Sequence, residues 1–127
     1  MRKKPTLHPP VTMLNVPDLQ AAIRWYEGIG FEVAELQPQD SNCSPNWALL
    51  AYGKATLMLS AGGNDQRPKN DSSLYFRTDQ VDALYAQMKD QVEVQYEPRD
   101  QFYGMRDFWV LDLNGFILGF GQTLQSS

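Results

Sequence analysis

Residues 12–26, TMLNVPDLQAAIRWY, decide how the chain folds, because the spacing of the apolar residues changes within them. The segment Val11–Val16 is rich in β-prone residues and predicts a strand. Beyond the strand, apolar residues recur at helical spacing, and one face of the helix is formed by Leu19, Ala22, Ile23 and Tyr26. Asp18 is suited to cap this helix, and Gly28 and Gly30 are suited to end it. The chain therefore begins with a strand followed directly by an amphipathic helix.

The remaining elements follow in an order that occurs twice. Three strands are predicted after the first helix, at Phe31–Leu36, Trp47–Tyr52 and Ala55–Ala61. Residues 62–72 are polar and rich in Gly, Asn and Asp, which predicts a linker. Further strands are expected at Ser73–Arg77, Val92–Glu97, Met105–Leu111 and Phe116–Thr123. Asp79 is expected to cap the second helix, whose apolar face is Val81, Leu84, Tyr85 and Met88.

The two helices suggest an internal duplication. Each residue on the apolar face of the second helix lies at the same offset from its counterpart on the first. We therefore predict an α+β fold of two βαβββ modules, residues 7–61 and 72–124, within a single domain spanning residues 1–127. The alternative is that two similar helices occur by chance in an ordinary α+β chain.

Composition and charge exclude several classes of function. The chain has 127 residues, the size of one domain with its own core. Its net charge is -4 and its Lys and Arg residues are mostly scattered, which argues against a nucleic-acid-binding surface. No apolar run approaches the length of a membrane helix, and the N-terminal residues do not resemble a signal peptide. We therefore expect a cytoplasmic protein, and Cys43, as the only cysteine, excludes an intrachain disulfide.

A tight turn at Gly53-Lys54 predicts which side chains share a face of the sheet. In a two-residue hairpin, Tyr52 faces Ala55 and the pairing continues outward from there. One face is then uniformly aliphatic, as expected beneath a helix, and consists of Ala48, Leu50, Leu57 and Leu59. The other face is mixed, as expected of a pocket wall, and consists of Trp47, Leu49, Ala51, Thr56, Met58 and Ser60.

Alternation along the other strands extends this mixed face. The candidate ligand-binding residues are Met13, Asn15, Trp47, Leu49, Met58, Ser60, Tyr75, Arg77, Asp107 and Trp109. Such a face also suits a dimer contact or a second core, so both alternatives stay open. Asp107 is the one carboxylate on this face, and it is expected either to orient a ligand or to form an ion pair with Arg77 or Arg106.

Three segments together resemble a known family. The run Thr12–Leu19, followed by Trp25-Tyr26-Glu27 and Gly30-Phe31, is similar to the opening module of the glyoxalase, bleomycin-resistance and extradiol-dioxygenase (vicinal oxygen chelate) superfamily. Asp112-Leu113-Asn114-Gly115-Phe116 resembles the Asp-Pro-Asp-Gly-aromatic turn before the last strand, and Tyr103–Phe108 resembles the segment before that turn. The resemblance covers nearly the whole chain. It implies a curved, eight-stranded mixed sheet shaped as a cup, with the helices on its outer face.

The resemblance also places the metal-ligand positions of the family. Metal-dependent members supply four His, Gln or Glu ligands, and the matching positions here are Val11, Met58, Ser73 and Gly119. Val and Gly side chains offer no donor atom, and Met and Ser are poor donors for a divalent first-row metal. His8, the only histidine, lies among prolines before the first strand and is expected to have a surface or packing role. We therefore expect neither a metal nor another cofactor.

These observations favour a binding protein over an enzyme. No residue set suits nucleophilic catalysis, because His8 is the only histidine and Cys43 has no evident partner. The expected function is metal-independent binding or sequestration of a small aromatic or amphipathic molecule, as in antibiotic-resistance members of the family. Two alternatives remain: a metal-dependent lyase, isomerase or dioxygenase, and a non-catalytic dimeric interaction module. The family resemblance further implies a homodimer, in which one cup is built from one chain or from two.

Overall fold

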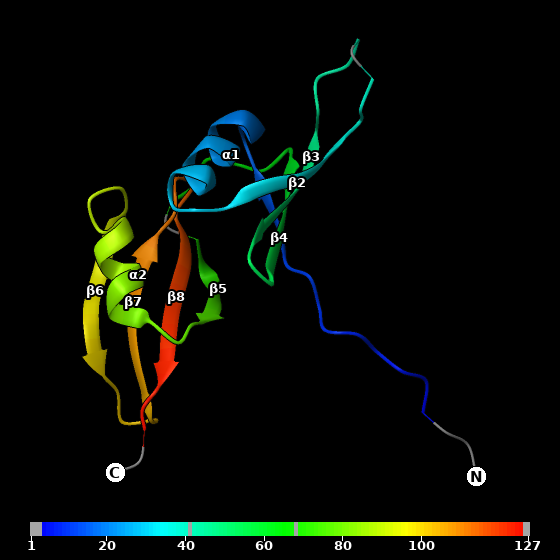
Figure 1. Ribbon diagram of the computed structural model, residues 1–127. Helices are drawn as coiled ribbons and strands as arrows, with labels where there is room; N and C mark the ends of the chain where they lie inside the picture. The colour runs from blue at the N-terminus through cyan, green and yellow to red at the C-terminus, as the bar shows by residue number, and fades with distance from the viewer. Residues whose placement is uncertain (1–3, 41, 68, 126–127) are drawn as a thin grey trace.

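The structure is a computed structural model that describes residues 4–40, 42–67 and 69–125. The predicted domain and linker thus include residues 1–3, 41, 68 and 126–127, which lie outside the described part. The first module contains β1 (Met13–Val16), α1 (Leu19–Gly28), β2 (Glu32–Gln37), β3 (Trp47–Tyr52) and β4 (Ala55–Ala61). The second contains β5 (Lys69–Arg77), α2 (Val81–Met88), β6 (Glu93–Asp100), β7 (Met105–Leu111) and β8 (Phe116–Thr123). The predicted α+β class and the repeated βαβββ order are confirmed (Figure 1).

The strands form two mixed sheets of four strands each. Sheet A has the order β1-β4-β3-β2, and sheet B has the equivalent order β5-β8-β7-β6. In each sheet the first strand of the module runs parallel to the last, and the other neighbours are antiparallel. The eight predicted strands are therefore arranged as two sheets that are not hydrogen-bonded to each other within the described residues, rather than as one continuous sheet.

Helix α1 forms as its sequence predicts. The side chain of Asp18 accepts a hydrogen bond from the Ala21 backbone N–H at 3.1 Å, which caps the first turn. The helix ends at Gly28, and Gly30 has a φ of 118°, a conformation that glycine adopts without strain. The buried residues are Leu19, Ala22, Ile23 and Tyr26, the predicted apolar face. Helix α1 contacts β2, β3 and β4 of its own module.

Helix α2 begins differently from the prediction. Asp79 does not cap it: the N-cap position is Gln80, which makes no side-chain capping bond. Instead, the Val81 backbone N–H donates to Oε1 of Gln122, on β8, at 2.9 Å. A residue distant in sequence thus accepts a hydrogen bond from a backbone N–H of the first turn. The capping role predicted for Asp79 from its position next to the helix is therefore wrong. Along the described ranges, neither helix is long and apolar enough to cross a membrane.

Four strands differ in their bounds from the prediction: β1 begins at Met13 rather than Val11, β2 is shifted by one residue, and β5 and β6 differ most. Strand β5 begins at Lys69 rather than Ser73, and its register with β8 shifts between these two residues. Strand β6 continues to Asp100, although it contains Pro98, and its pairing with β7 shifts twice. Both strands lie at the edges of sheet B, where polar side chains and a proline are tolerated because one side of the strand needs no partner. Hydrophobic alternation therefore underestimates their length.

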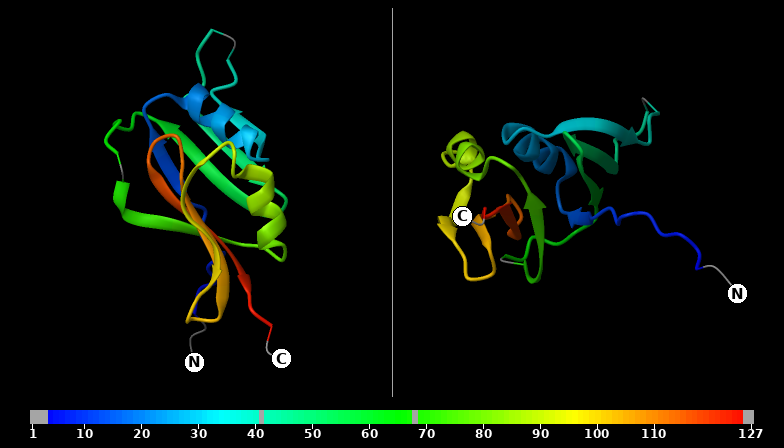
Figure 2. Two further views of the ribbon diagram at one scale, coloured as in Figure 1. Left: turned by 90° about the vertical axis from the view of Figure 1, so that its left-hand side faces the viewer. Right: turned by 60° about the horizontal axis from the view of Figure 1, so that its bottom comes forward.

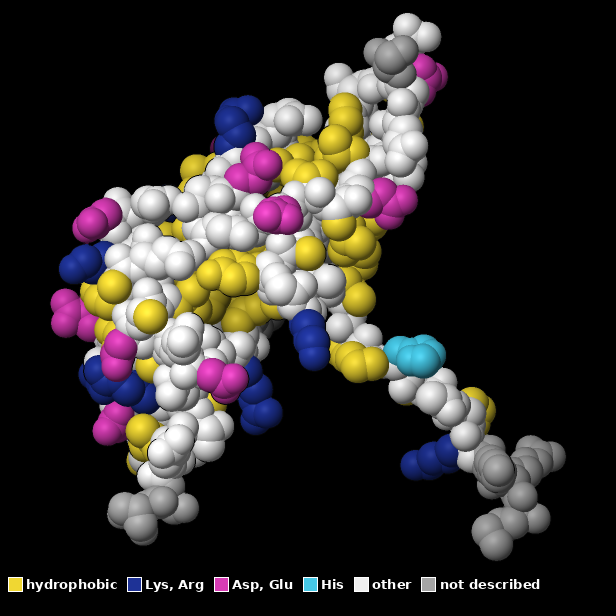
Figure 3. Space-filling model, in the orientation of Figure 1, with side chains coloured by type: hydrophobic (Ala, Val, Ile, Leu, Met, Phe, Trp, Pro, Cys, Tyr) yellow, Lys and Arg dark blue, Asp and Glu magenta, His cyan; other side chains and the backbone are white. Residues whose placement is uncertain are grey.

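The two modules share one hydrophobic core. The Phe31 and Phe76 rings, one from each module, have centroids 6.0 Å apart. The buried Tyr26 hydroxyl donates to Oδ2 of Asp112 at 2.6 Å, joining α1 to the turn before β8. Figure 2 shows the two modules as adjacent units, each with its helix against its own sheet. Hydrophobic side chains reach the surface where the modules meet, between α1 and α2 (Figure 3).

Candidate functional site

The helix-free side of sheet A carries six of the ten candidate residues. The predicted hairpin register is confirmed, since Tyr52 pairs with Ala55 and Trp47 with Ser60. Strand β1 then places Met13 beside Met58 and Asn15 beside Ser60. We name this side face A, which comprises Met13, Asn15, Trp47, Leu49, Met58 and Ser60. All six side chains are at least partly exposed, whereas the alternate residues of the hairpin are buried beneath α1.

Strand β2 adds two polar residues to face A that the sequence did not predict. Glu35 lies opposite Leu49, and Gln37 lies opposite Trp47. The Gln37 side-chain amide donates to Oε1 of Glu35 at 3.1 Å. The register of β2 shifts between Val33 and Glu35, so simple alternation along the strand could not place these side chains on this face.

The helix-free side of sheet B carries the other four candidates. One row across the sheet runs from Tyr75 through Gly119 and Trp109 to Tyr96. The next row runs from Arg77 through Gly121 and Asp107 to Arg99. We name this side face B, which comprises Tyr75, Arg77, Tyr96, Arg99, Asp107 and Trp109. The Arg99 guanidinium lies 4.8 Å from the centre of the Tyr96 ring, a cation–π contact that the sequence did not predict.

Two glycines allow the aromatic rings to lie close to sheet B. A Cβ atom at Gly119 would lie 2.7 Å from the Trp109 ring, and one at Gly121 would lie 1.9 Å from the Tyr75 hydroxyl. Both rings therefore occupy space that the side chain of any residue other than glycine would fill at positions 119 and 121. The Trp109 and Tyr75 ring centroids are 5.5 Å apart, within the range of favourable aromatic contact. Face B thus presents a continuous aromatic surface.

Asp107 is the polar centre of face B. Its carboxylate is fully buried and accepts hydrogen bonds from the Tyr75 hydroxyl at 2.8 Å, the Gln101 side-chain amide at 3.0 Å and the Tyr103 hydroxyl. The sequence singled out Asp107 and Tyr75 but missed Gln101 and Tyr103, which flank the β6–β7 turn. Three hydrogen-bond donors satisfy this buried carboxylate, which takes part in none of the ion pairs among the described residues.

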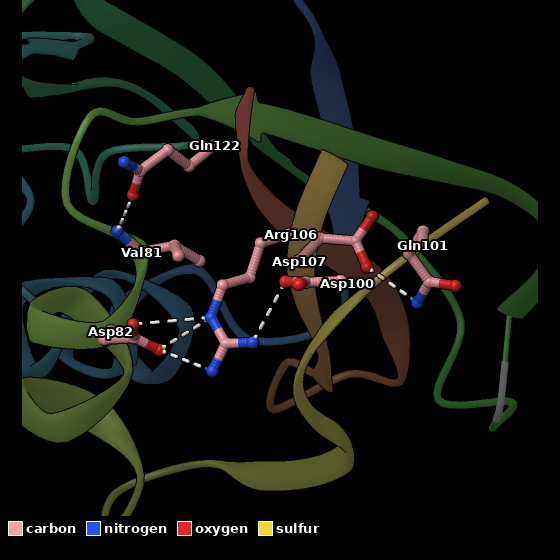
Figure 4. Close-up of polar contacts among 7 residues, drawn as sticks. All are labelled: Val81, Asp82, Asp100, Gln101, Arg106, Asp107 and Gln122. Carbon is pink, nitrogen blue, oxygen red and sulfur yellow. Dashed lines mark hydrogen bonds and ion pairs between the residues drawn. The ribbon is translucent and has the colours of Figure 1, made fainter. Parts of the chain in front are cut away.

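The predicted ion pair of Asp107 with an arginine is wrong. Arg106 points away from Asp107 and pairs with Asp82 on α2 at 3.0 Å and with Asp100 on β6 at 3.2 Å (Figure 4). Arg77 takes part in none of the ion pairs among the described residues. Adjacent residues of a strand point to opposite faces, so Arg106 could not share the environment of Asp107.

The carboxylate changes the acidity of the two phenols that bond to it. Desolvation of the Tyr75 hydroxyl, its hydrogen bond to Asp107 and the charge of Asp107 raise the pKa of Tyr75 well above its ordinary value. Desolvation and the same carboxylate also raise the pKa of Tyr103. Both phenols therefore remain protonated at neutral pH and act as hydrogen-bond donors.

The residues at the family's metal-ligand positions do not fit a metal ion. Met58 lies between Met13 and Leu49 on face A, and Ser73 lies beside Ile117 on sheet B. The Trp109 ring covers the space above Gly119, so no side chain there could reach a metal. In the part of the chain that the structure describes, no group of three or more His, Cys, Asp or Glu side chains is placed to hold a metal ion. His8 is exposed on the extended segment before β1.

A groove lies between faces A and B. It has a volume of about 570 Å³ and is lined by β1 residues, including Met13 and Asn15, and by β5 residues, including Lys69 and Ser73. The contacts between the modules described above lie on the core side of the sheets, so the two helix-free faces remain accessible. The groove and faces can offer stacking surface, flexible apolar contacts and fixed donors to an organic molecule.

Comparison with known proteins supports this description of the fold. Residues 8–120 match the family described as Glyoxalase/Bleomycin resistance protein/Dioxygenase superfamily. No curated protein sequence matches the chain.

Three solved structures illustrate the similarity in fold. A bleomycin-binding protein in complex with bleomycin has a TM-score of 0.71 at 20% identity, covering 92% of this chain and 99% of its own. TioX from Micromonospora sp. ML1 has a TM-score of 0.73 at 18% identity, with coverages of 94% and 99%. A glyoxalase-related enzyme from Clostridium phytofermentans has a TM-score of 0.77 at 14% identity, with coverages of 97% and 100%.

At such identities the solved structures indicate the fold alone, and they include both a binding protein and an enzyme. The family match covers most of the chain and agrees with the two βαβββ modules. This chain therefore belongs to the Glyoxalase/Bleomycin resistance protein/Dioxygenase superfamily.

Proposed function

We propose that this protein binds, and thereby sequesters, a small aromatic or amphipathic organic molecule on faces A and B without a metal ion. The observation that carries the proposal is the construction of face B. Trp109 and Tyr75 lie over Gly119 and Gly121, beside a buried carboxylate that holds the Tyr75 hydroxyl. Such a surface is preorganised, because its rings and donors are held in place before a ligand arrives.

The two faces supply complementary interactions. Each aromatic ring of a ligand stacked on Trp109 or Trp47 would contribute about 0.5–1.5 kcal/mol beyond the burial of its area. Met13 and Met58 are flexible and adapt to ligands of irregular shape. Arg77 and Asn15 are exposed and can orient polar groups of a ligand. The mixture of apolar walls and a few polar groups is typical of small-molecule sites.

The fold comparison agrees with this proposal. A protein of the same fold binds bleomycin, at 20% identity to this chain. We place this chain with the metal-free, bleomycin-resistance-like members because Val11, Met58, Ser73 and Gly119 do not form a metal-ligand set. A metal-dependent lyase, isomerase or dioxygenase would need a different donor set.

We further propose a homodimer. Met13 is 51% exposed, Tyr96 51% and Tyr75 39%, although all three have large apolar surfaces. Exposed apolar surface of this kind commonly marks a binding or protein–protein contact site. A second chain would cover part of these faces and narrow the groove into a cup. The same observation supports the second candidate function, a dimeric interaction module without a ligand.

A binding experiment in chelator distinguishes these functions. Purified protein in EDTA is screened against aromatic antibiotics and metabolites by thermal shift and by quenching of tryptophan fluorescence. We expect a saturable ligand whose affinity falls in Trp109→Ala but not in the control Trp25→Phe, because Trp25 lies on α1, away from both faces. A dimer that is lost on Trp109→Glu, with no ligand in the panel, would support the interaction module instead.

A further inference from the structure

Face B carries two exposed arginines in a chain that is acidic as a whole. The net charge of the chain is -4, so the protein has no general attraction for anions. Arg77 and Arg99 nevertheless lie at the two ends of one row across sheet B. Neither takes part in any of the ion pairs among the described residues. Trp109 lies on β7, one of the two strands between them, so the positive charges flank its ring.

The side chains of both arginines lie on face B. Arg77 is two residues from Tyr75 on the same strand, so their side chains point to the same side of the sheet. Desolvation and Asp107 raise the pKa of Tyr75, and the charge of Arg77 acts in the opposite direction, as expected of a guanidinium near the hydroxyl. The Arg99 guanidinium lies over the Tyr96 ring of the same face.

The acidic side chains of this face are already satisfied. Among the described side chains, two acids have a paired position on this side of sheet B. Asp107 is buried and accepts three hydrogen bonds, and Glu93 forms an ion pair with Arg67 at 2.9 Å. Asp107 lies directly opposite Arg99 but two strands from Arg77. Its negative charge therefore offsets the charge of Arg99 more than that of Arg77, because the interaction weakens with distance.

Face A provides a contrast within the same chain. It also carries a tryptophan, Trp47, but its charged residues are acidic: Glu32 lies opposite Ala51, and Glu35 lies opposite Leu49. Both carboxylates are exposed, and neither takes part in the ion pairs among the described residues. An aromatic anion is therefore repelled by the charges of face A and attracted by those of face B, although both faces offer a ring for stacking.

We propose that the aromatic ligand of face B carries a negative charge, which Arg77 binds while the ring of the ligand stacks on Trp109. This inference rests on the proposed function and narrows its class of ligand. A guanidinium offers a planar fork of N–H donors that matches a carboxylate or a phosphate. The Cα atoms of Arg77 and Trp109 are two strand spacings and one row apart, about 12 Å. An aromatic ring with a short acidic arm spans the gap between the two side chains.

NMR of the tryptophan indole N–H groups tests this proposal, because Trp25, Trp47 and Trp109 report separately on α1, face A and face B. The full-length protein is titrated with three probes that share an indole ring: indoleacetate is negative, tryptophol is neutral and tryptamine is positive. We expect indoleacetate to shift the Trp109 signal saturably, with a dissociation constant on the order of 1 mM for a ligand of this size. Tryptophol should bind about fivefold more weakly, as expected for the loss of one exposed ion pair, and tryptamine more weakly still.

Matched variants identify the arginine. Arg77→Gln should remove the roughly fivefold advantage of indoleacetate over tryptophol and leave the affinity for tryptophol unchanged. The control Arg24→Gln removes an exposed arginine from α1 and should change neither affinity. Added salt should weaken the binding of indoleacetate alone among these two probes, because ions screen an exposed pair.

The outcomes separate the charge of the ligand from the binding of a ligand. Equal or tighter binding of tryptophol or tryptamine at Trp109 overturns the negative charge and leaves the proposed function intact. A preference for indoleacetate that survives Arg77→Gln overturns the assignment to Arg77. If indoleacetate saturates the Trp47 signal at a lower concentration than the Trp109 signal, the anion binds on face A and the proposal is wrong. If none of the three probes shifts Trp109, this proposal and stacking on face B fail together.

Discussion

Replacing Gly119 with alanine tests how face B is built. The new Cβ atom would lie 2.7 Å from two atoms of the Trp109 ring and 2.8 Å from a third. Carbon atoms do not approach so closely, and the indole ring is rigid, so the whole side chain must move. Overpacking of this kind costs about 1–3 kcal/mol of unfolding free energy. We expect Gly119→Ala to destabilise the protein by that cost less the gain of about 0.5–1 kcal/mol that alanine has over glycine in a strand.

The same substitution should have the opposite effect once the ring is gone. In Trp109→Ala protein nothing opposes the Cβ atom, and alanine in a strand is more stable than glycine by about 0.5–1 kcal/mol because it loses less backbone entropy. The gain of alanine over glycine is present in both backgrounds and cancels in the cycle, so the two substitutions are coupled by the overpacking cost of about 1–3 kcal/mol.

Urea denaturation followed by circular dichroism measures this coupling in the four proteins of the cycle. Circular dichroism is preferred because Trp109→Ala alters the fluorescence signal. If Gly119→Ala cost the same in both backgrounds, the ring would not lie over the glycine, and the account of face B would be refuted. Because Gly119 is one of the family's metal-ligand positions, the same measurement tests whether the Trp109 ring fills the space that a ligand side chain would need there.

Three further predictions concern the buried carboxylates. Tyr26→Phe removes a hydrogen bond to buried Asp112 and should lower the unfolding free energy in urea by about 1–3 kcal/mol; a cost below about 0.5 kcal/mol would contradict the link between the modules. Burial raises the pKa of Asp112, so the folded state holds this proton more tightly than the unfolded state does. The stability of the native protein relative to Asp112→Asn should therefore fall as pH rises from the ordinary carboxyl pKa through the raised one, and a rise would contradict it. Asp107→Asn removes a charge that raises the pKa of Tyr75 and Tyr103, so their phenolate absorbance should appear at lower pH; an unchanged titration would contradict the network.

The sequence was sufficient to predict the elements that depend on local patterns. Gly53 determines the hairpin, and from it the register of β3 and β4 follows by counting. The apolar face of α1 and its cap at Asp18 are equally local. Counting by alternate residues also placed Asp107 and Trp109 on the side of sheet B opposite the core.

Features that depend on partners distant in sequence could not be predicted. Gln122 accepts a hydrogen bond from the first turn of α2, a role that the sequence pattern had assigned to Asp79. Tyr103 and Gln101 reach Asp107 only because the β6–β7 turn folds back over the strand. The division into two sheets was not visible either, because alternation specifies the faces of a strand but not its neighbours.

The central claim is that faces A and B bind an organic molecule without a metal ion. The most direct measurement is calorimetric titration of one ligand from the screen into protein freed of metal with EDTA, repeated with stoichiometric zinc, manganese or iron(II). The account predicts saturable binding with the same dissociation constant in every case. In Trp109→Ala the dissociation constant should be larger. Binding that appears only when a divalent metal is added, and that survives Trp109→Ala, would contradict it.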